Sequence, residues 1–131
     1  MPGARVTPYD KRWPRDFLRA AKVLRKTLGE AALRIDHIGS TSVPGIDAKP
    51  VIDMQLTVAD LAIVETFVRP LRPLGFMFRS AITADRPPPW EDPDPHRWEK
   101  RYFRTATRPR RELAHLRLRT HLHVRRRRSV S

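Results

Sequence analysis

The run of residues 38–56, IGSTSVPGIDAKPVIDMQL, constrains the fold of this chain more than any other stretch. A Gly-Ser pair ends one apolar segment, a loop rich in proline and glycine follows, and a second apolar segment comes soon after a lysine. This order predicts two short strands joined by a loop. The connection would place Ser40, Lys49 and Asp53 along one edge of a sheet.

Asp53 is the residue in this run whose position most needs an explanation. It lies between Ile52 and Met54 in an apolar strand, where burying a carboxylate is costly unless it is paired or bound to a metal. Strand alternation places Asp53 and Gln55 on the same face. Loop amides, a cation and a carboxylate together suit a phosphate ester with a divalent metal. The alternative is an ordinary turn beside a strand aspartate, since glycine-rich loops are weak signals.

The loop itself offers several groups that can bind a phosphate. Gly39 lets the backbone approach a ligand because it has no Cβ, and Ser40 adds a hydroxyl donor. Thr41 and Ser42 are secondary candidates for the same role. Lys49 would neutralise charge on a triphosphate, or else it is an exposed loop lysine.

A later strand contributes His121 and His123, which share one face by alternation. Two histidines at this spacing can bind a transition metal or relay a proton, or they are incidental on a half-exposed strand. Arg104 would face an anion if its side of the sheet meets the cleft. His37, next to the Gly-Ser pair, is expected to be a packed structural residue, and the alternative is that it orients the loop.

These motifs together resemble the signature of the GrpB-like family in the nucleotidyltransferase superfamily. The block GSTSVPG…AKPVID is the most specific match, and VTPYDKRWPRDF, WEKRYFR and THLHV also resemble the family's pattern, so the resemblance spans residues 6 to about 124. It implies the nucleotidyltransferase fold and a phosphate-binding role for Gly39 and Ser40. Gln55 stands where an active transferase is expected to carry an acid. The chain also stops soon after HLHV, where the family is expected to continue into further helices.

The resemblance raises the question of which residues would hold a metal. Transfer with two metal ions usually uses about three carboxylates, and the neutral Gln55 is a weak ligand. The expected cofactor is therefore a single Mg²⁺ (or Mn²⁺) bound largely through substrate phosphates. Asp53 and Gln55 are the candidate catalytic positions, and the candidate metal ligands are Asp53, His121 and His123.

The chain is strongly basic, and the charge is concentrated near its C-terminus. The formal net charge is +13, and residues 99–131 hold 12 of the 27 basic residues but 2 of the 14 acidic ones. Such a basic region attracts RNA or another polyanion without a sequence code, and a solvated tail is the alternative. The absence of cysteine excludes a disulfide framework and a thiolate metal site. No apolar run reaches membrane-spanning length, so a cytoplasmic protein is expected.

The hydrophobic pattern predicts one α/β (α+β) domain with a small mixed sheet and flanking helices. The domain is expected over residues 1–124, truncated relative to the family, with a basic tail over 125–131 that is dispensable for folding. Pro70 and Pro73 are expected to break or bend the second helix. The expected helices are 13–28 and 61–69, the expected strands are 32–38, 51–58, 76–79, 98–105 and 120–125, and 83–96 is expected as a mobile loop.

The leading functional prediction is a nucleotidyltransferase-like protein that binds a nucleoside triphosphate with a divalent metal. If active, it would transfer a nucleotidyl group to an acceptor that the sequence does not name. The alternative is a non-catalytic nucleotide- or RNA-binding module, with Gln55 marking lost chemistry. A third hypothesis is an incomplete domain that folds only as an oligomer or with a partner.

Overall fold

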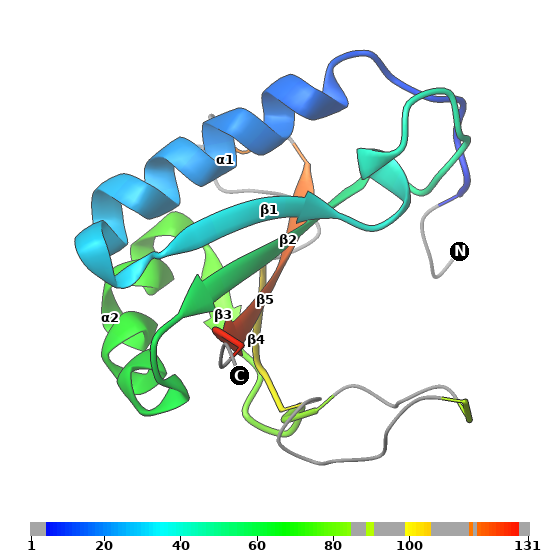
Figure 1. The fold of residues 1–131 in the computed structure, drawn as a ribbon. Coiled ribbons are helices and arrows are strands. Elements are labelled where there is room, and N and C mark those ends of the chain that lie inside the picture. The colour runs from blue at the N-terminus through cyan, green and yellow to red at the C-terminus, as the bar shows by residue number, and fades with distance from the viewer. Residues whose placement is uncertain (1–4, 85–88, 91–98, 106–115, 117, 129–131) are drawn as a thin grey trace.

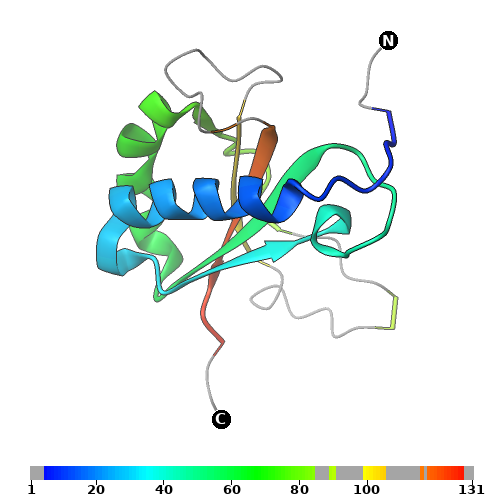
Figure 2. The same ribbon diagram turned by 90° about the horizontal axis from the view of Figure 1, so that it is seen from above.

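A five-stranded mixed sheet organises the chain, shown as a computed structural model in Figures 1 and 2. The structure describes residues 5–84, 89–90, 99–105, 116 and 118–128. The strands are β1 (Arg34–Ile38), β2 (Val51–Val58), β3 (Phe76–Phe78), β4 (Arg101–Thr105) and β5 (Arg119–Arg126), in the spatial order β1-β2-β5-β4-β3. Strands β2 and β5 pair in parallel, and the other neighbours are antiparallel. The prediction of a mixed α+β domain is confirmed.

The side chains of strand β2 alternate between an apolar face of the sheet and a polar one. Its side chains alternate between buried and half-buried along the whole strand. Ile52, Met54 and Leu56 are almost completely buried and belong to the core, where each stabilises the fold by about 1.5–3 kcal/mol. Asp53 and Gln55 therefore project from the opposite face, as alternation predicted.

Helix α1 (Trp13–Leu28) covers the apolar face and agrees with the predicted boundaries. Pro14 occupies its first turn, where the missing N–H needs no partner. Trp13, Ala20 and Leu24 recur at helical spacing and are buried in the core. Figure 2 shows the helix lying across the strands.

The segment after β2 is helical, as expected, and it continues past Pro70 as a series of short helices. It consists of the 3-10 helix η3 (Leu61–Phe67), the short α2 (Val68–Leu71) and the 3-10 helix η4 (Arg72–Leu74). Each proline lies in the first turn of a new short helix, where a missing N–H is tolerated. Asp60 caps the segment by accepting a hydrogen bond from the Ala62 N–H at 2.9 Å.

The last strand continues past the predicted end of the domain. Arg125 and Arg126 pair with Thr57 and Val58 of β2, and the Arg127 N–H donates to the Val58 carbonyl at 2.7 Å. Backbone pairing therefore crosses the expected boundary at residue 124. The predicted strand over 98–105 begins at Arg101, and most of the predicted loop over 83–96 lies outside the described residues.

Candidate functional site

Polar side chains gather on the sheet face that lies opposite α1, which we call the open face. Strand register places them in two rows that cross four or five strands. The first row is Ile38, Asp53, His121, Arg104 and Met77, and the second is Asp36, Gln55, His123 and Tyr102. Parallel pairing of β2 with β5 therefore brings the predicted Asp53 and His121 directly side by side, although 68 positions separate them in the chain.

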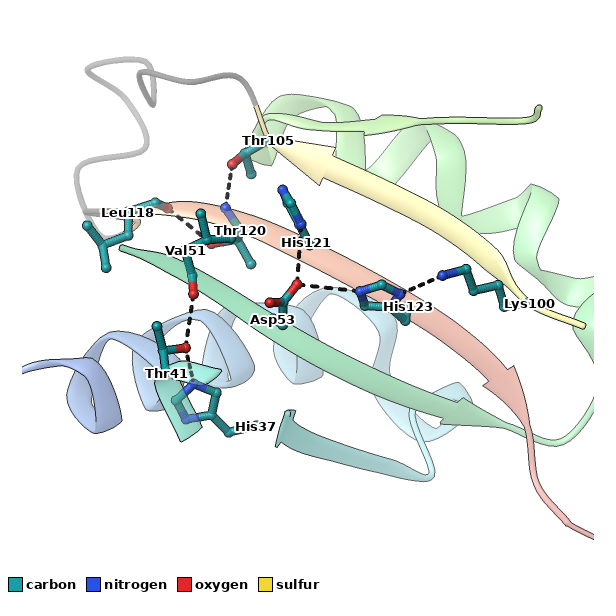
Figure 3. A network of polar contacts seen from close by, with 10 residues as sticks. All are labelled: His37, Thr41, Val51, Asp53, Lys100, Thr105, Leu118, Thr120, His121 and His123. Atoms are coloured by element: carbon teal, nitrogen blue, oxygen red, sulfur yellow. Dashed lines mark hydrogen bonds and ion pairs between the residues drawn. The ribbon is translucent and has the colours of Figure 1, made fainter. Parts of the chain in front are cut away.

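Asp53 contacts both histidines of β5 (Figure 3). Its Oδ1 lies 3.2 Å from His121 Nδ1 and 3.5 Å from His123 Nε2. The three side chains are partly buried, with exposed fractions of 29%, 23% and 17% in the order Asp53, His121, His123. These contacts are partly shielded from solvent, which strengthens hydrogen bonds to the carboxylate.

Lys100 joins this network, and sequence reasoning did not single it out. It is 6% exposed, and its Nζ lies 3.0 Å from His123 Nδ1. An ammonium group can only donate, so this contact makes Nδ1 the acceptor and places the ring proton of His123 on Nε2, facing Asp53. In the sequence, Lys100 stands just before the predicted strand in WEKRYFR. That position gives no sign that the side chain contacts a residue of β5.

The charges within the network explain how the Asp53 carboxylate stays ionised. Burial alone would raise the pKa of Asp53, but hydrogen bonds from His121 and His123, together with the charge that either ring carries when protonated, outweigh burial and lower the pKa to about 2. Burial lowers the pKa of Lys100, while the negative charge of Asp53 opposes that effect. The site therefore holds a carboxylate that is charged at neutral pH.

The Gly-Ser loop packs directly against Asp53. It forms a short 3-10 turn, η2 (Ser40–Ser42), in which the Ser42 hydroxyl donates to the Gly39 carbonyl at 2.5 Å. Gly39 has a φ of +75°, and a Cβ added to it would lie 2.8 Å from Asp53 Oδ2. A side chain at residue 39 would therefore clash with the carboxylate, so glycine is what allows the close approach.

Thr41 anchors the loop from the interior side. Its side chain is 2% exposed, and its hydroxyl donates to the Val51 carbonyl at 2.9 Å. His37 Nε2 lies 3.0 Å from the same hydroxyl, and the His37 ring stacks on Phe17 of α1 with centroids 4.9 Å apart. Burial lowers the pKa of His37. The Thr41 hydroxyl is thus engaged within the protein, and His37 both packs and orients the loop.

The remaining predicted residues lie at the margins of the site. Ser40 is exposed at the start of the turn, and Lys49 is exposed in the loop before β2. Gln55 lies between Asp36 and His123 in the second row. Sequence reasoning did not consider Asp36, whose two carboxylate oxygens accept a bifurcated hydrogen bond from the Arg34 Nε–H at 2.8–2.9 Å.

The donor set fits a divalent cation only in combination with a substrate. Within the described residues, no group of three or more His, Cys, Asp or Glu side chains is arranged to hold a metal ion. Both histidines contact Asp53 Oδ1, which leaves Oδ2 beside Gly39 as the oxygen for a cation. A hard cation that takes one carboxylate oxygen and completes its shell with phosphates and water fits this arrangement.

Comparison with known proteins identifies the family. The family model described as GrpB protein matches residues 4–131, and the chain therefore belongs to the GrpB family. The crystal structure of the conserved protein GrpB from Enterococcus faecalis aligns with a TM-score of 0.69 and 25% identity, covering 93% of this chain and 61% of that one. The fold and the family expected from the resemblance are both confirmed.

Relatives with similar sequences carry two kinds of name. A UPF0157 protein of Halalkalibacterium halodurans is 51% identical over 71 residues, which cover 54% of this chain and 36% of the relative. A protein named dephospho-CoA kinase from Mycolicibacterium paratuberculosis is 36% identical over 126 residues, which cover 87% of this chain and 31% of the relative. The chain spans about a third of the length of these relatives. No helix among the described residues is long and apolar enough to cross a membrane.

Proposed function

We propose that this chain binds a nucleoside triphosphate and a divalent cation on the open face, with Asp53 at the centre, and that it transfers a nucleotidyl group to an acceptor. The observation that carries the proposal is the ionised Asp53 carboxylate, held by His121 and His123 and approached by the backbone at Gly39. Membership of the GrpB family supports the proposal. The cytoplasm remains the expected location.

The residues of the site would have separate roles in binding the substrate and in orienting the carboxylate. Mg²⁺ (or Mn²⁺), held at Asp53, would neutralise the substrate phosphates. His121 and His123 fix the orientation of the Asp53 carboxylate and keep it charged. Ser40 and the exposed Lys49 would contact phosphate oxygens from the loop. Most of the rate enhancement would then come from positioning and electrostatic stabilisation.

The test of this proposal is the binding of a nucleotide with and without a metal. Thermal-shift and calorimetric titrations with nucleoside triphosphates and Mg²⁺ or Mn²⁺ should show stabilisation by about 2.7 kcal/mol at a hundredfold excess over Kd. Asp53→Asn should abolish the metal-dependent part while the protein stays folded, because it keeps the shape and removes the charge. Gln55→Glu should tighten metal binding by adding a carboxylate to the same face. Equal nucleotide binding by Asp53→Asn and wild type would refute the role of Asp53.

A second candidate function is a non-catalytic module that binds a nucleotide or RNA. The observation that favours it is the run Arg125–Arg128, which begins in β5, ends just beyond it and carries four adjacent positive charges. Arg126, Arg127 and Arg128 are exposed. Binding without nucleotide turnover, combined with strong salt dependence, would favour this module over the transferase.

A further inference from the structure

Three arginines lie on the open face, one next to the end of β3, one on β4 and one on β5. Arg104 pairs with His121 in the register of β4 and β5, and Arg119 lies two residues before His121 on the same face of β5. The Arg79 N–H donates to the Tyr102 carbonyl at 2.8 Å, which extends the pairing of β3 with β4 by one residue. The side chain of Arg79 therefore leaves the sheet on the face that carries Tyr102.

Strand register makes Arg104 the diagonal neighbour of both other arginines. Arg104 pairs with His121, two residues after Arg119, and it lies two residues after Tyr102, which faces Arg79. Diagonal positions on one face of a sheet are about 7–8 Å apart, which is within reach of long side chains.

The arginine cluster also contains a hydrogen-bond donor for which the described residues provide no acceptor. The Nε of Arg119 is buried and has no hydrogen-bond partner. Arg12, Arg34 and Arg101 pair with Asp10, Asp36 and Glu99, respectively. Among the described residues, no such ion pair neutralises Arg79, Arg104 or Arg119. A buried donor without an acceptor destabilises the folded protein, and a bound anion would offset that cost.

We propose that Arg79, Arg104 and Arg119 form a second anion subsite on the open face and that its ligand is a phosphate group. Planar guanidinium groups match phosphate oxygens in bidentate contacts, and Arg104 and Arg119 are half-buried, which strengthens such contacts. A compact phosphate suits this partly enclosed position better than a polyanion, for which the exposed Arg126–Arg128 are more accessible.

The position of the subsite indicates which phosphate groups of the reactants could occupy it, an inference that rests on the proposed function. Asp53 and His121 lie between Arg104 and the Gly39 loop in the first row. A nucleotide bound at the loop would therefore leave the arginines to its terminal phosphates or to a phosphate on the acceptor. The terminal phosphates of the nucleotide and a phosphate on the acceptor would make the same contacts with arginine, and binding experiments can distinguish between them.

The subsite is tested with inorganic phosphate and pyrophosphate in the absence of metal and nucleotide. Calorimetric titration should show that Arg104→Gln and Arg119→Gln each weaken binding of pyrophosphate by about tenfold or more. Arg126→Gln is the matched control, because it removes the same charge from an exposed position on the other face of β5. Equal weakening by all three variants, or no binding by the wild type, would overturn the proposal.

A second readout locates the ligand. The side-chain N–H signal of Arg119 in a ¹H–¹⁵N spectrum should shift on addition of pyrophosphate, because its Nε gains an acceptor. An unchanged signal at saturation would also overturn the proposal. Asp53→Asn should retain pyrophosphate binding, since the arginines do not depend on the carboxylate. Failure of the proposed function would leave this result intact, and failure of the subsite would leave nucleotide binding at Asp53 intact.

A nucleotide series then distinguishes the two sources. If the terminal phosphates occupy the subsite, Arg119→Gln should weaken binding of a triphosphate more than binding of a monophosphate. If the acceptor supplies the phosphate, Arg119→Gln should leave both nucleotides unaffected, and pyrophosphate should still bind in the presence of saturating triphosphate. A third outcome would contradict the proposal. In it, Arg119→Gln weakens binding of the monophosphate and of the triphosphate by the same factor, and pyrophosphate does not compete with either nucleotide. Arg119 would then act on nucleotide binding in some way other than through a phosphate subsite.

Discussion

At the scale of single residues, the site depends on how closely the loop backbone approaches one carboxylate. Gly39 and Asp53 are separated by 14 positions in the chain, yet a Cβ on Gly39 would lie within 2.8 Å of Asp53 Oδ2. The glycine thus serves both the turn and the carboxylate. Conservative substitutions of Gly39 and Asp53 can therefore test the contact between them.

Gly39→Ala should lower the stability of the protein by about 1–3 kcal/mol, because it combines a left-handed backbone with a clash. Gly45→Ala is the matched control, since Gly45 also has a positive φ, of +82°, but a Cβ there meets nothing within 4 Å. Denaturant unfolding of both variants measures the difference, which reports the contact with Asp53. Equal losses in the two variants would mean that the carboxylate tolerates the extra methyl group.

Acid stability is the second test at this scale. Because the pKa of Asp53 falls from 3.8 to about 2, the carboxylate contributes stability that is fully present above pH 3.8 and is lost as the pH falls through 2. The contribution is roughly 2 kcal/mol. Asp53→Asn should therefore be less stable than wild type at neutral pH, and the two curves of unfolding free energy should converge near pH 2. A constant difference down to that pH would assign the loss to packing rather than to charge.

At the scale of secondary-structure elements, β5 connects the site to the core. One face of the strand places Leu122 and Val124 in the core, and the other presents His121 and His123 to Asp53. Its pairing with β2 also continues through Arg126. Arg125 and Arg126, which sequence reasoning placed in a dispensable basic tail, therefore form part of the central strand pair.

Truncation after Val124 should lower Tm by about 5 °C or more, because it removes the backbone bonds that Arg125 and Arg127 contribute beside β2. Truncation after Arg128 is the control and should leave Tm nearly unchanged. Thermal unfolding followed by circular dichroism measures both. If the shorter variant melts at the wild-type temperature, the last residues of β5 add no stability.

At the scale of the whole molecule, the net charge of +13 should govern any contact with nucleic acid. If the chain binds RNA, its affinity should fall at least about tenfold between roughly 50 and 200 mM salt and should vary little with RNA sequence, because counterion release dominates. Fluorescence anisotropy with two unrelated RNA sequences of equal length measures both effects. An affinity that is insensitive to salt would exclude a contact driven by charge.

The sequence predicted local features well, because they depend on the spacing of apolar residues and on turn chemistry. The helix over residues 13–28, the strand over 51–58 and the projection of Asp53 from the apolar strand all follow from periodicity. The strand over 120–125 was predicted to within one residue of β5 at each end, but its parallel pairing with β2, which continues through Arg126, was not predicted. The helical turns after Pro70 were also missed, because proline stops a continuing helix and not a new one.

The sequence by itself determined the family, the two faces of the central strand and the candidates Asp53, His121 and His123. The tertiary structure alone decided which of these residues meet, because the parallel pairing of β2 with β5 is a long-range contact that no local pattern encodes. The same pairing brought His123 and its partner Lys100 to Asp53, and the pairing of β4 with β3 and β5 placed Arg79, Arg104 and Arg119 on one face. Residue types indicated the chemistry, and the register of distant strands fixed its geometry.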